Sequence, residues 1–427
     1  MSIEMPSFPH QLLMSDYSYE LPPQRIALMP LENRDHSKLL LADAFLQKLN
    51  HHSFFELPQL LPPSSLLIRN NTRVISARLM MNKLSGGRVE ILCTEPVLPS
   101  TDLTQSLFAK GTVRWKALVG GKKIFTGAKL SVASTIKLAD SEKPLFLKAE
   151  IIEKSGSDAV IDFVWSPESL PFAAILETLG KIPLPPYIKR ETTDSDTIRY
   201  QTVYAVNEGS VAAPTAGLHF TDRVFEGLRA KHIEIQDLTL HVGLGTFKPV
   251  ESNDVLQHVM HREKISIPKS TIESLLQFLE RPLSEERRLV AVGTTSARTL
   301  ESLYWFGTKL IFRTGLKDTE ISLGQWEVYK LMQEKPVRAS AAFDAVLEWM
   351  LKHQLESAVG ETQLFILPPY EFKVCNALIT NFHQPESTLM LMVAAFLRNN
   401  FWREVYHEAL AKDYRFLSYG DSSLLLT

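Results

Sequence analysis

Cysteine is scarce in this chain of 427 residues, which contains only Cys93 and Cys375. Two cysteines so far apart form neither a disulfide framework nor a CxxC metal motif, so we expect no metal site. Long apolar runs are also missing, because the longest, Leu389–Leu397, is too short to span a bilayer. The N-terminus lacks the cationic and then apolar pattern of a signal peptide. These absences predict a cytoplasmic protein that is not embedded in a membrane.

Low-complexity tracts are absent too, and the overall composition is that of a folded protein. Apolar residues make up 45% of the chain, which favours a packed globule over a disordered polypeptide. A chain of 427 residues exceeds the usual size of a single hydrophobic core. We therefore expect two or three domains.

Acidic residues are missing from one stretch of the chain, residues 103–139. Residues 69–137 contain twelve Lys and Arg but only three Asp and Glu, so this region carries +9 in a protein whose net charge is −2. Clustered cations suit contacts to phosphate groups, and Lys122 and Lys123 are candidates for such contacts. Trp115 is a candidate for stacking on a base, although a tryptophan in a strand commonly belongs to a core. The competing interpretation is a basic face that contacts only solvent.

The same region differs from its surroundings in pattern. Its short, often alternating runs, separated by Gly, Pro, Ser and Asp, are typical of antiparallel β structure in a small barrel or sandwich. These runs are RVEILCTEPV, TVRWKALVG, AKLSVASTIKL, LFLKAEIIEK and DAVIDFVW. The flanking segments show both helix and strand patterns. We therefore predict an inserted β domain at residues 84–165, within a discontinuous mixed α/β domain made of residues 1–83 and 166–427.

Five segments of the predicted mixed domain place polar residues where a strand or loop meets a turn. In one of them, Thr221 suits the N-cap position of a helix and His219 lies just before it. Ligands of open α/β sheets bind beyond the carboxyl ends of the strands, so we expect these turns to gather around one pocket. The five segments are Ser210–Arg223, Ile233–Phe247, Arg287–Ser302, Val374–Phe396 and Tyr414–Leu426.

Several of these segments also resemble a known family. PTAGLHF, HVGLGTF, GTTSARTLES, TNFHQPESTL and YRFLSYGDSSLL are similar to signature segments of the S-adenosylmethionine:tRNA ribosyltransferase-isomerase family of queuosine biosynthesis. The segments YELPPQRIALMPLENRDHSKLL, NNTRVISARL and IPLPPYIKR resemble that family as well. The similar segments occur in order from about Tyr17 to Leu426, which is nearly the whole chain.

Three features depart from the pattern of that family. Asn71 stands where the family usually has Asp, which is a possible change in the site, and Pro369 replaces a usual Gly. An extra stretch lies between Leu303 and Val359, and we expect part of it to form an amphipathic helix packed on the main domain. The apolar positions of that helix are Phe343, Val346, Leu347, Met350, Leu351 and Leu355.

The resemblance implies both a fold and an unusual reaction. The fold is that of an α+β multidomain protein, with a larger mixed α/β domain and a smaller inserted antiparallel β-barrel domain. The reaction moves the ribosyl part of S-adenosylmethionine onto 7-aminomethyl-7-deazaguanine at the tRNA wobble position. The ribose is isomerised to an epoxycyclopentane, giving epoxyqueuosine-tRNA, while adenine and methionine leave. S-adenosylmethionine is consumed as a cosubstrate, so the resemblance implies no metal or other cofactor.

The similar segments supply candidate residues for this reaction. His219, His241 and His383 suit proton transfer because the pKa of free histidine lies near neutrality, and the sequence leaves open which is acid and which is base. Asp421 is the fourth catalytic candidate, with a turn-forming role as its alternative. The substrate-binding candidates are Arg73, Thr215, Thr294, Thr295, Ser296, Arg298, Asn381 and Tyr419. The tRNA-binding candidates are Tyr187, Arg190, Lys122 and Lys123.

Each of these assignments has a structural alternative. Arg73 and Arg298 can hold a carboxylate or a phosphate in bidentate fashion, or can form buried pairs with Asp or Glu. The threonine and serine hydroxyls can instead cap a helix or stabilise a turn. Tyr187 and Arg190 lie in the proline-rich segment IPLPPYIKR, which is also consistent with a rigid linker.

Two other classes of function stay open. An S-adenosylmethionine-dependent methyltransferase needs a Gly-rich turn that leads into a helix, whereas GLGTF is followed by Lys-Pro-Val. A non-catalytic tRNA-binding paralogue is consistent with the loss of a carboxylate at Asn71. His258 and His261 lack the Glu of an HExxH motif, so we assign them no metal. The expected partners are S-adenosylmethionine and a tRNA with a queuosine-type anticodon, and the protein is expected to be a monomer or a homodimer.

Overall fold

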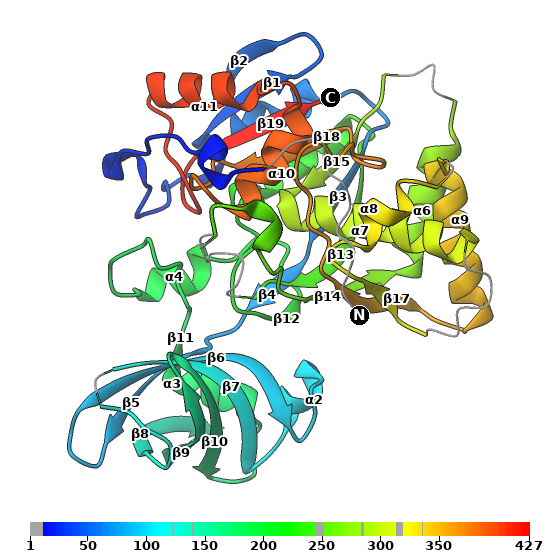
Figure 1. Cartoon of the computed structure of the whole chain (residues 1–427). Coiled ribbons are helices and arrows are strands. Elements are labelled where there is room, and N and C mark those ends of the chain that lie inside the picture. The colour runs from blue at the N-terminus through cyan, green and yellow to red at the C-terminus, as the bar shows by residue number, and fades with distance from the viewer. Residues whose placement is uncertain are drawn as a thin grey trace.

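The computed structural model contains two domains, which lie one above the other in Figure 1. A large mixed sheet covered by helices forms the main domain, and an antiparallel β-barrel forms the smaller one. This architecture confirms the predicted fold class. The structure describes residues 12–121, 123–138, 141–243, 252–282, 286–312, 319–334 and 336–427.

Within the described residues, the main sheet has ten strands in the order β16-β17-β14-β13-β3-β15-β18-β19-β1-β2. The central strands β13, β3, β15 and β18 run parallel, so their carboxyl ends meet at one edge of the sheet. The central strands are rich in apolar residues because a parallel sheet is covered on both faces. In the order given, the strands are Ile321–Leu323, Ser357–Thr362, Glu263–Pro268, Glu234–His241, Leu66–Asn70, Leu289–Val292, Ala377–Asn381, Ser422–Leu426, Lys38–Asp43 and Lys48–Ser53.

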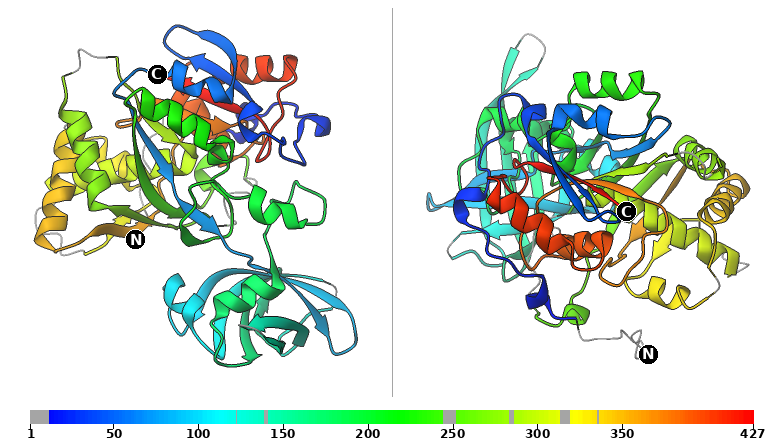
Figure 2. Two further views of the ribbon diagram at one scale, coloured as in Figure 1. Left: turned by 180° about the vertical axis from the view of Figure 1, so that it is seen from behind. Right: turned by 90° about the horizontal axis from the view of Figure 1, so that it is seen from above.

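Helices cover both faces of this sheet, as the two views of Figure 2 show. Alternation along β3 explains why two hydrophobic cores form: Leu66 and Ile68 pack into the first, whereas Leu67 packs into the second. The first core contains α6 (Lys269–Glu280), α7 (Gly293–Phe312), α9 (Ala339–Lys352), α10 (Thr388–Leu397) and α11 (Trp402–Ala411). The second contains α1 (Leu57–Leu60) and α5 (Asp222–Ala230).

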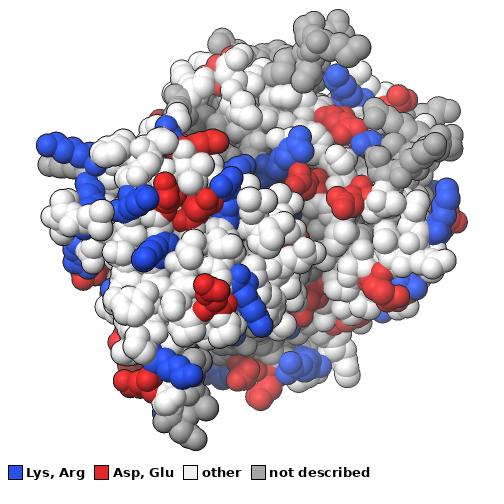
Figure 3. Space-filling view, turned by 90° about the horizontal axis from the view of Figure 1, so that it is seen from below, with Lys and Arg blue, Asp and Glu red and all other residues white. Residues whose placement is uncertain are grey.

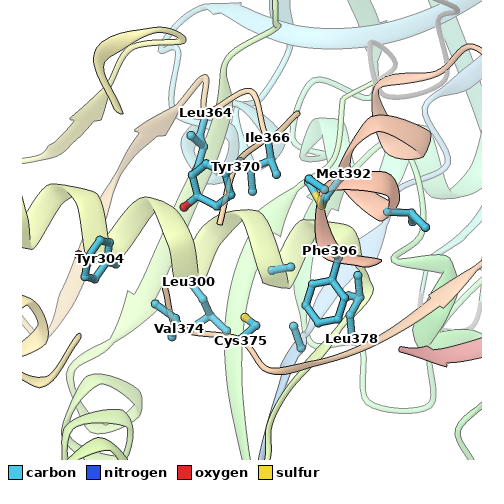
Figure 4. Close-up of a cluster of buried hydrophobic side chains, with 14 of the residues drawn as sticks. Leu300, Tyr304, Leu364, Ile366, Tyr370, Val374, Cys375, Leu378, Met392 and Phe396 are labelled. Carbon is cyan, nitrogen blue, oxygen red and sulfur yellow. The ribbon is translucent and has the colours of Figure 1, made fainter. Parts of the chain in front are cut away.

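Helix α7 crosses the first core and is buried from Gly293 to Lys309. Figure 4 shows Leu300 of this helix packed with Tyr370, Cys375 and Phe396. These side chains come from segments far apart in the sequence, so the core joins the helix to the C-terminal third of the chain.

One carboxylate is buried in this core. Glu301 accepts hydrogen bonds from the Tyr370 hydroxyl at 2.6 Å and from the backbone N–H groups of Lys373 and Val374, both at 2.9 Å. Burial raises the pKa of Glu301, although these hydrogen bonds oppose the shift. A buried polar group is tolerated when its hydrogen bonds are satisfied. Glu301 therefore fixes the segment around Tyr370 to α7.

The extra stretch between Leu303 and Val359 forms α8 (Glu327–Leu331), α9 and strand β16. Helix α9 packs against α6 and α7, as we predicted. Phe343, Val346 and Met350 are buried, whereas Leu351 is 55% exposed, so the predicted apolar stripe is wrong at that position. Gly307 allows α7 and α9 to approach closely, because a Cβ atom there would lie 2.0 Å from the carbonyl oxygen of Ala342.

The smaller domain is a closed barrel of antiparallel strands in the order β5-β6-β7-β10-β9-β8, with β8 pairing back to β5. The predicted boundary at residue 84 differs from the structure, because β5 precedes it in the sequence and belongs to the barrel sheet. The strands in chain order are Arg78–Lys83, Arg88–Leu98, Thr112–Gly120, Lys129–Leu138, Ser141–Ser155 and Asp158–Ser166. Helices α2 (Leu103–Phe108) and α3 (Phe172–Leu179) pack on the barrel, and β11 (Gly180–Lys181) pairs with β5.

The two domains are joined by short elements between them. Strands β4 (Thr72–Val74) and β12 (Asn207–Ser210) form a parallel pair of their own. Helix α4 (Asp194–Arg199) and the 3-10 turn η5 (Thr215–His219) lie on the connection from the barrel back to the main sheet. Thr221 caps α5 as predicted, since its side chain accepts a hydrogen bond from the Val224 N–H.

Candidate active site

A pocket lies beyond the carboxyl ends of the central strands, where the topology predicts ligand binding. We call it the strand-end pocket, and its volume is about 60 Å³. Its walls come from η5, the start of α7, the end of β18 and the start of α10. The described residues that carry polar side chains into its lining are Tyr187, Thr215, Thr294, Thr295, Thr380, Asn381, His383, Gln384, Ser387 and Ser418.

Asn381 holds two walls of the strand-end pocket together. Its side-chain oxygen accepts a hydrogen bond from the Thr215 hydroxyl at 2.8 Å, and its amide donates to the carbonyl oxygen of Leu417 at 3.2 Å. Asn381 is buried at the end of β18. Both predicted substrate-binding residues, Thr215 and Asn381, therefore lie in one network within the pocket.

Thr295 offers the pocket a hydroxyl without a partner. This residue lies in the first turn of α7 and is 6% exposed, and its Oγ1 makes no hydrogen bond to any described residue. A buried polar atom without a partner costs free energy. Such an atom in the lining of a pocket is well placed to bind a ligand.

His383 is the one predicted catalytic histidine that lines this pocket. Its Nε2 lies 2.8 Å from the Thr380 hydroxyl, and its backbone N–H donates to the Tyr406 hydroxyl at 3.1 Å. Burial lowers the pKa of His383 to about 3. The imidazole is therefore neutral near pH 7.

No Asp, Glu, Lys or Arg among the described residues lines the strand-end pocket. Its polar groups are hydroxyls, amides and one neutral imidazole. The pocket can therefore hydrogen-bond a nucleoside or orient a polar group, but a charged part of a ligand needs its counterion elsewhere.

His219 lines a different, smaller hollow. Its Nε2 lies 2.9 Å from the carbonyl oxygen of Gly420, and its Nδ1 lies 3.2 Å from that of Ala216. Burial lowers the pKa of His219, although these hydrogen bonds and the nearby Asp421 oppose the shift. His219 lies just before α5, as the sequence indicates, but it is buried in η5 and both ring nitrogens face carbonyl groups.

His241 lines a third space, the inter-domain cleft, which has a volume of about 740 Å³ and lies between the barrel and the main domain. Its Nδ1 lies 2.9 Å from the Thr72 hydroxyl. Burial, and then the charge of Lys264, lower the pKa of His241 to about 4. The expectation of one cleft shared by the three histidines is therefore wrong, because each of them lines a different space. Their catalytic roles stay predictions.

Asp421 stabilises a turn. Its carboxylate accepts hydrogen bonds from the backbone N–H groups of Lys38 at 3.0 Å and Arg415 at 2.7 Å. It also lies 3.6 Å from the guanidinium group of Arg415. These contacts match the turn-forming alternative that the sequence left open for Asp421.

Arg190 and Tyr419 share one buried carboxylate. The Arg190 guanidinium donates two hydrogen bonds of 2.7 Å to Asp196, and the Tyr419 hydroxyl donates a third at 2.8 Å. Although burial opposes the shift, these donors lower the pKa of Asp196. These contacts hold α4 against the C-terminal turn. The predicted contacts of Arg190 with tRNA and of Tyr419 with substrate stay predictions.

Other predicted residues are also engaged within the protein. Arg298 forms a buried ion pair of 2.8 Å with Glu263, and the Ser296 hydroxyl donates to the carbonyl oxygen of Val292. Arg73 lies in β4, outside the strand-end pocket, with its guanidinium 3.9 Å from Glu208. The carboxylate clamp that we expected from Arg73 or Arg298 is therefore absent from the described lining of this pocket.

Tyr187 and Thr294 do line the strand-end pocket. The Tyr187 hydroxyl is hydrogen-bonded to the Ser418 hydroxyl, and burial raises the pKa of Tyr187. Tyr187 thus forms a wall of the pocket. Contact with a base from the tRNA stays a prediction.

The expected basic face of the barrel is interrupted by carboxylates. Arg114 pairs with Asp162 at 2.6 Å and Lys116 with Glu95 at 2.9 Å, because strands distant in sequence become neighbours in the barrel. Figure 3 shows Lys and Arg interspersed with Asp and Glu on the face seen from below. Lys123 is exposed, and Lys122 lies outside the described residues. Trp115 is fully buried against Phe172, so the core alternative holds and the side chain does not stack on a base.

Several residues that line the strand-end pocket were not among the predicted site residues. Thr380, Gln384 and Ser387 all belong to the segment around His383, and Ser387 caps α10 by accepting from the Met390 N–H. The strand-to-helix pattern of this segment was the available signal, because polar residues between β18 and α10 must lie at the strand end.

Comparison with known proteins identifies the family of this chain. A family model described as "Queuosine biosynthesis protein" matches residues 14–425. Over 414 residues the chain is 37% identical to the S-adenosylmethionine:tRNA ribosyltransferase-isomerase of Azoarcus sp. (strain BH72), with 97% of each chain covered. It is 36% identical to the protein of that name from Thermotoga maritima, covering 97% of this chain and 99% of the other. The chain belongs to the queuosine biosynthesis protein family.

One solved structure in this family is a crystal structure of an S-adenosylmethionine tRNA ribosyltransferase from Thermotoga maritima. It is 29% identical in sequence, and the match covers 96% of this chain and 100% of that chain with a TM-score of 0.45. Within the described residues, no helix combines the length and apolar character that crossing a membrane requires.

The family departure at Asn71 lies outside the strand-end pocket. The Asn71 side-chain oxygen accepts hydrogen bonds from the Thr239 hydroxyl at 2.8 Å and from the Asn207 amide at 3.1 Å. An Asp at this position would offer an oxygen to the same two donors. The Asn71 amide can therefore accept the same two hydrogen bonds that a carboxylate would accept here.

Proposed function

We propose that this protein transfers and isomerises the ribosyl group of S-adenosylmethionine onto 7-aminomethyl-7-deazaguanine at the tRNA wobble position. The products are epoxyqueuosine-tRNA, adenine and methionine. The observation that carries the proposal is the family match over residues 14–425, and the strand-end pocket supplies a site of the kind that the reaction needs.

The reaction sets three requirements for the site. A proton leaves the carbon beside the sulfonium, adenine departs and takes up a proton, and a neutral aminomethyl group attacks the ribose. A pocket lined by hydroxyls, an amide and a neutral imidazole can orient the ribose and the adenine through hydrogen bonds. Thr294, Thr295 and Asn381 are the proposed contacts, because these polar residues line the pocket.

His383 is proposed to act in the pocket as a neutral hydrogen-bonding group. A pKa of about 3 makes it a weak base near pH 7, since an efficient general base has a pKa near the working pH. His219 is proposed as a positioning residue, because its ring joins η5 to the Gly420 turn. Asp421 is proposed to stabilise the same turn, because its carboxylate accepts a hydrogen bond from the Arg415 N–H. His241 is the predicted histidine with access to the inter-domain cleft.

S-adenosylmethionine is proposed as a consumed cosubstrate, so we propose no cofactor. A tRNA with a queuosine-type anticodon is the proposed macromolecular substrate, and we propose a cytoplasmic location for the protein. We propose that it acts as a monomer or as a homodimer.

One assay tests the proposed function against its alternatives. The protein is incubated with S-adenosylmethionine and tRNA bearing the 7-aminomethyl base, and the small products are separated by chromatography. We expect adenine and methionine in equal amounts. S-adenosylhomocysteine would instead identify a methyltransferase, and tRNA binding without any product would identify the non-catalytic paralogue.

A further inference from the structure

Three arginine side chains line one hollow beside the strand-end pocket. Arg34, Arg199 and Arg415 line a hollow that also contains His219, and we call it the guanidinium hollow. Ser418 lines both this hollow and the strand-end pocket, so the two are neighbours. The arginines come from a 3-10 turn (Arg34–His36), the end of α4 and the loop before β19. The tertiary structure therefore brings together like charges that are far apart in the sequence.

The protein neutralises these cations only in part. Arg34 and Arg199 donate hydrogen bonds to the backbone carbonyl oxygens of Gln201 and Glu32, each at 3.0 Å. Asp421 lies 3.6 Å from Arg415 and is the single carboxylate among the described residues that pairs with the trio. Burial and the charge of Arg199 lower the pKa of Arg34. Like charges held close together repel unless an anion lies between them.

A second observation points to a ligand at the same place. Ser37 also lines the guanidinium hollow, is 2% exposed, and its hydroxyl has no hydrogen-bond partner among the described residues. The hollow has a volume of about 20 Å³, which is room for one small polar group rather than for a base or a sugar. A hydroxyl donor and three guanidinium groups together match the acceptor atoms of an oxyanion.

We propose that the guanidinium hollow binds an oxyanion of a substrate whose reacting part occupies the strand-end pocket. This inference rests on the proposed function. Two sources supply such a group there: a phosphodiester of the RNA next to the wobble nucleotide, and the carboxylate of S-adenosylmethionine. The described lining of the strand-end pocket has no charged side chain. The hollow, on the other side of Ser418, provides the missing positive charge.

The test compares Arg199→Gln with the parent protein in two binding cycles. Arg199 is the variant of choice because its hydrogen bonds go to backbone carbonyl groups of Leu31 and Glu32. In the first cycle the ligand is an anticodon stem-loop RNA, with or without a neutral methylphosphonate at one phosphate beside the wobble nucleotide. In the second cycle it is S-adenosylmethionine or its decarboxylated analogue. Affinities are measured by calorimetry, which does not require turnover.

We expect Arg199→Gln to weaken one of the two unmodified ligands about tenfold, and the matching neutral ligand to bind both proteins equally. If Arg199→Gln weakens the binding of unmodified RNA but not of methylphosphonate RNA, the hollow binds the phosphodiester. If it weakens the binding of S-adenosylmethionine but not of the decarboxylated analogue, the hollow binds the carboxylate. If the variant effect is unchanged by either modification, or is absent, the hollow binds neither and the proposal is wrong. Failure of the adenine assay alone would overturn the proposed function but not this binding result.

Two further variants protect the interpretation. Arg34→Gln should behave like Arg199→Gln and replaces it if the latter does not fold. Arg403→Gln is the matched control, because this exposed arginine also donates to a backbone carbonyl, that of Asp16, but does not line the hollow. Its affinities for both ligands should equal those of the parent protein.

Discussion

The barrel and the main domain differ in where their polar side chains lie. The barrel buries apolar residues such as Trp115 and pairs its surface charges across neighbouring strands. The main domain instead buries hydroxyls, amides and imidazoles at its strand ends, among them Thr295, Asn381 and His383. Burying polar groups opposes folding unless they find partners. The difference indicates that the side-chain packing of the barrel contributes to stability, whereas the buried polar side chains at the strand ends of the main domain are suited to binding a ligand.

The largest expected contrast between the domains is their response to acid. His241 and His383 have pKa values of about 4 and about 3 in the folded protein, whereas unfolded histidine titrates near 6.5. Below pH 6.5 these two histidines bind protons in the unfolded chain but stay neutral in the folded chain until the pH approaches their lowered pKa values. Their contribution to stability is therefore complete above pH 6.5 and is lost as the pH falls toward 3. We expect a loss of about 4 kcal/mol between pH 7 and pH 5.

Urea unfolding at the two pH values measures this loss. His383→Gln should remove about half of the pH dependence. Residues 78–166 contain no histidine, so amide exchange in the barrel, corrected for intrinsic rates, should stay constant over the same range. Equal acid sensitivity in both domains would show that the buried histidines do not control it.

A core substitution in the barrel should have the next largest effect. Trp115→Ala removes a fully buried side chain that packs against Phe172. We expect a loss of about 3 kcal/mol in the free energy of unfolding. Amide exchange should locate the loss in the barrel, while the affinity for S-adenosylmethionine stays that of the parent protein. A change below about 1 kcal/mol would mean that the barrel core is not closely packed around this residue.

Thr295→Val should separate activity from stability within the main domain. The Thr295 hydroxyl has no described partner, so its loss should leave the free energy of unfolding unchanged or slightly raised. Adenine release should fall about thirtyfold in kcat/KM, because a substrate polar group loses its hydrogen bond.

Thr299→Val is the control on the same helix. The Thr299 hydroxyl donates to the carbonyl oxygen of Thr295 at 2.9 Å, and Thr299 does not line the pocket. This variant should lose stability by about 1 kcal/mol and keep its activity. If Thr295→Val kept its activity while Thr299→Val lost activity, the ligand would lie outside the strand-end pocket.

The smallest effect is expected on the barrel surface. Replacing Lys122 and Lys123 together by Ala should weaken tRNA binding only a few-fold and reduce the salt slope by at most about two, because each lost phosphate contact releases about one ion. Neighbouring cations such as Lys116 are already paired with carboxylates. Affinity measured at several salt concentrations tests this. A much larger loss of tRNA affinity would show that the barrel surface is the main contact for tRNA.

Much of the fold follows from local pattern. Alternation in segments such as TVRWKALVG predicts the barrel strands, and an apolar run followed by Gly-Thr-Thr-Ser predicts β15 and the start of α7. The apolar spacing of Phe343, Val346 and Met350 predicts α9. These predictions succeed because side-chain periodicity reflects which face of an element is buried.

Part of the candidate site follows from the same reasoning. Thr215, Thr294, Thr295, Asn381 and His383 were selected from polar turns at strand ends, and they meet because parallel strands place their carboxyl ends at one edge. The sequence could not separate His219 and His241 from this group. All three histidines lie where a strand or a loop meets a turn, and only the packing of those segments decides which cavity each ring faces.

The sequence by itself determined the family, the two-domain architecture and the strand ends at which a site would form, because these depend on residues close together in the chain. The tertiary structure alone decided which charges are paired. Arg298 meets Glu263, Arg190 meets Asp196, and the barrel cations meet acids from other strands. It also decided that Arg34, Arg199 and Arg415 line one hollow. The Coulomb energy of a charge depends on its distance in space from every other charge, and distance along the chain does not reveal it.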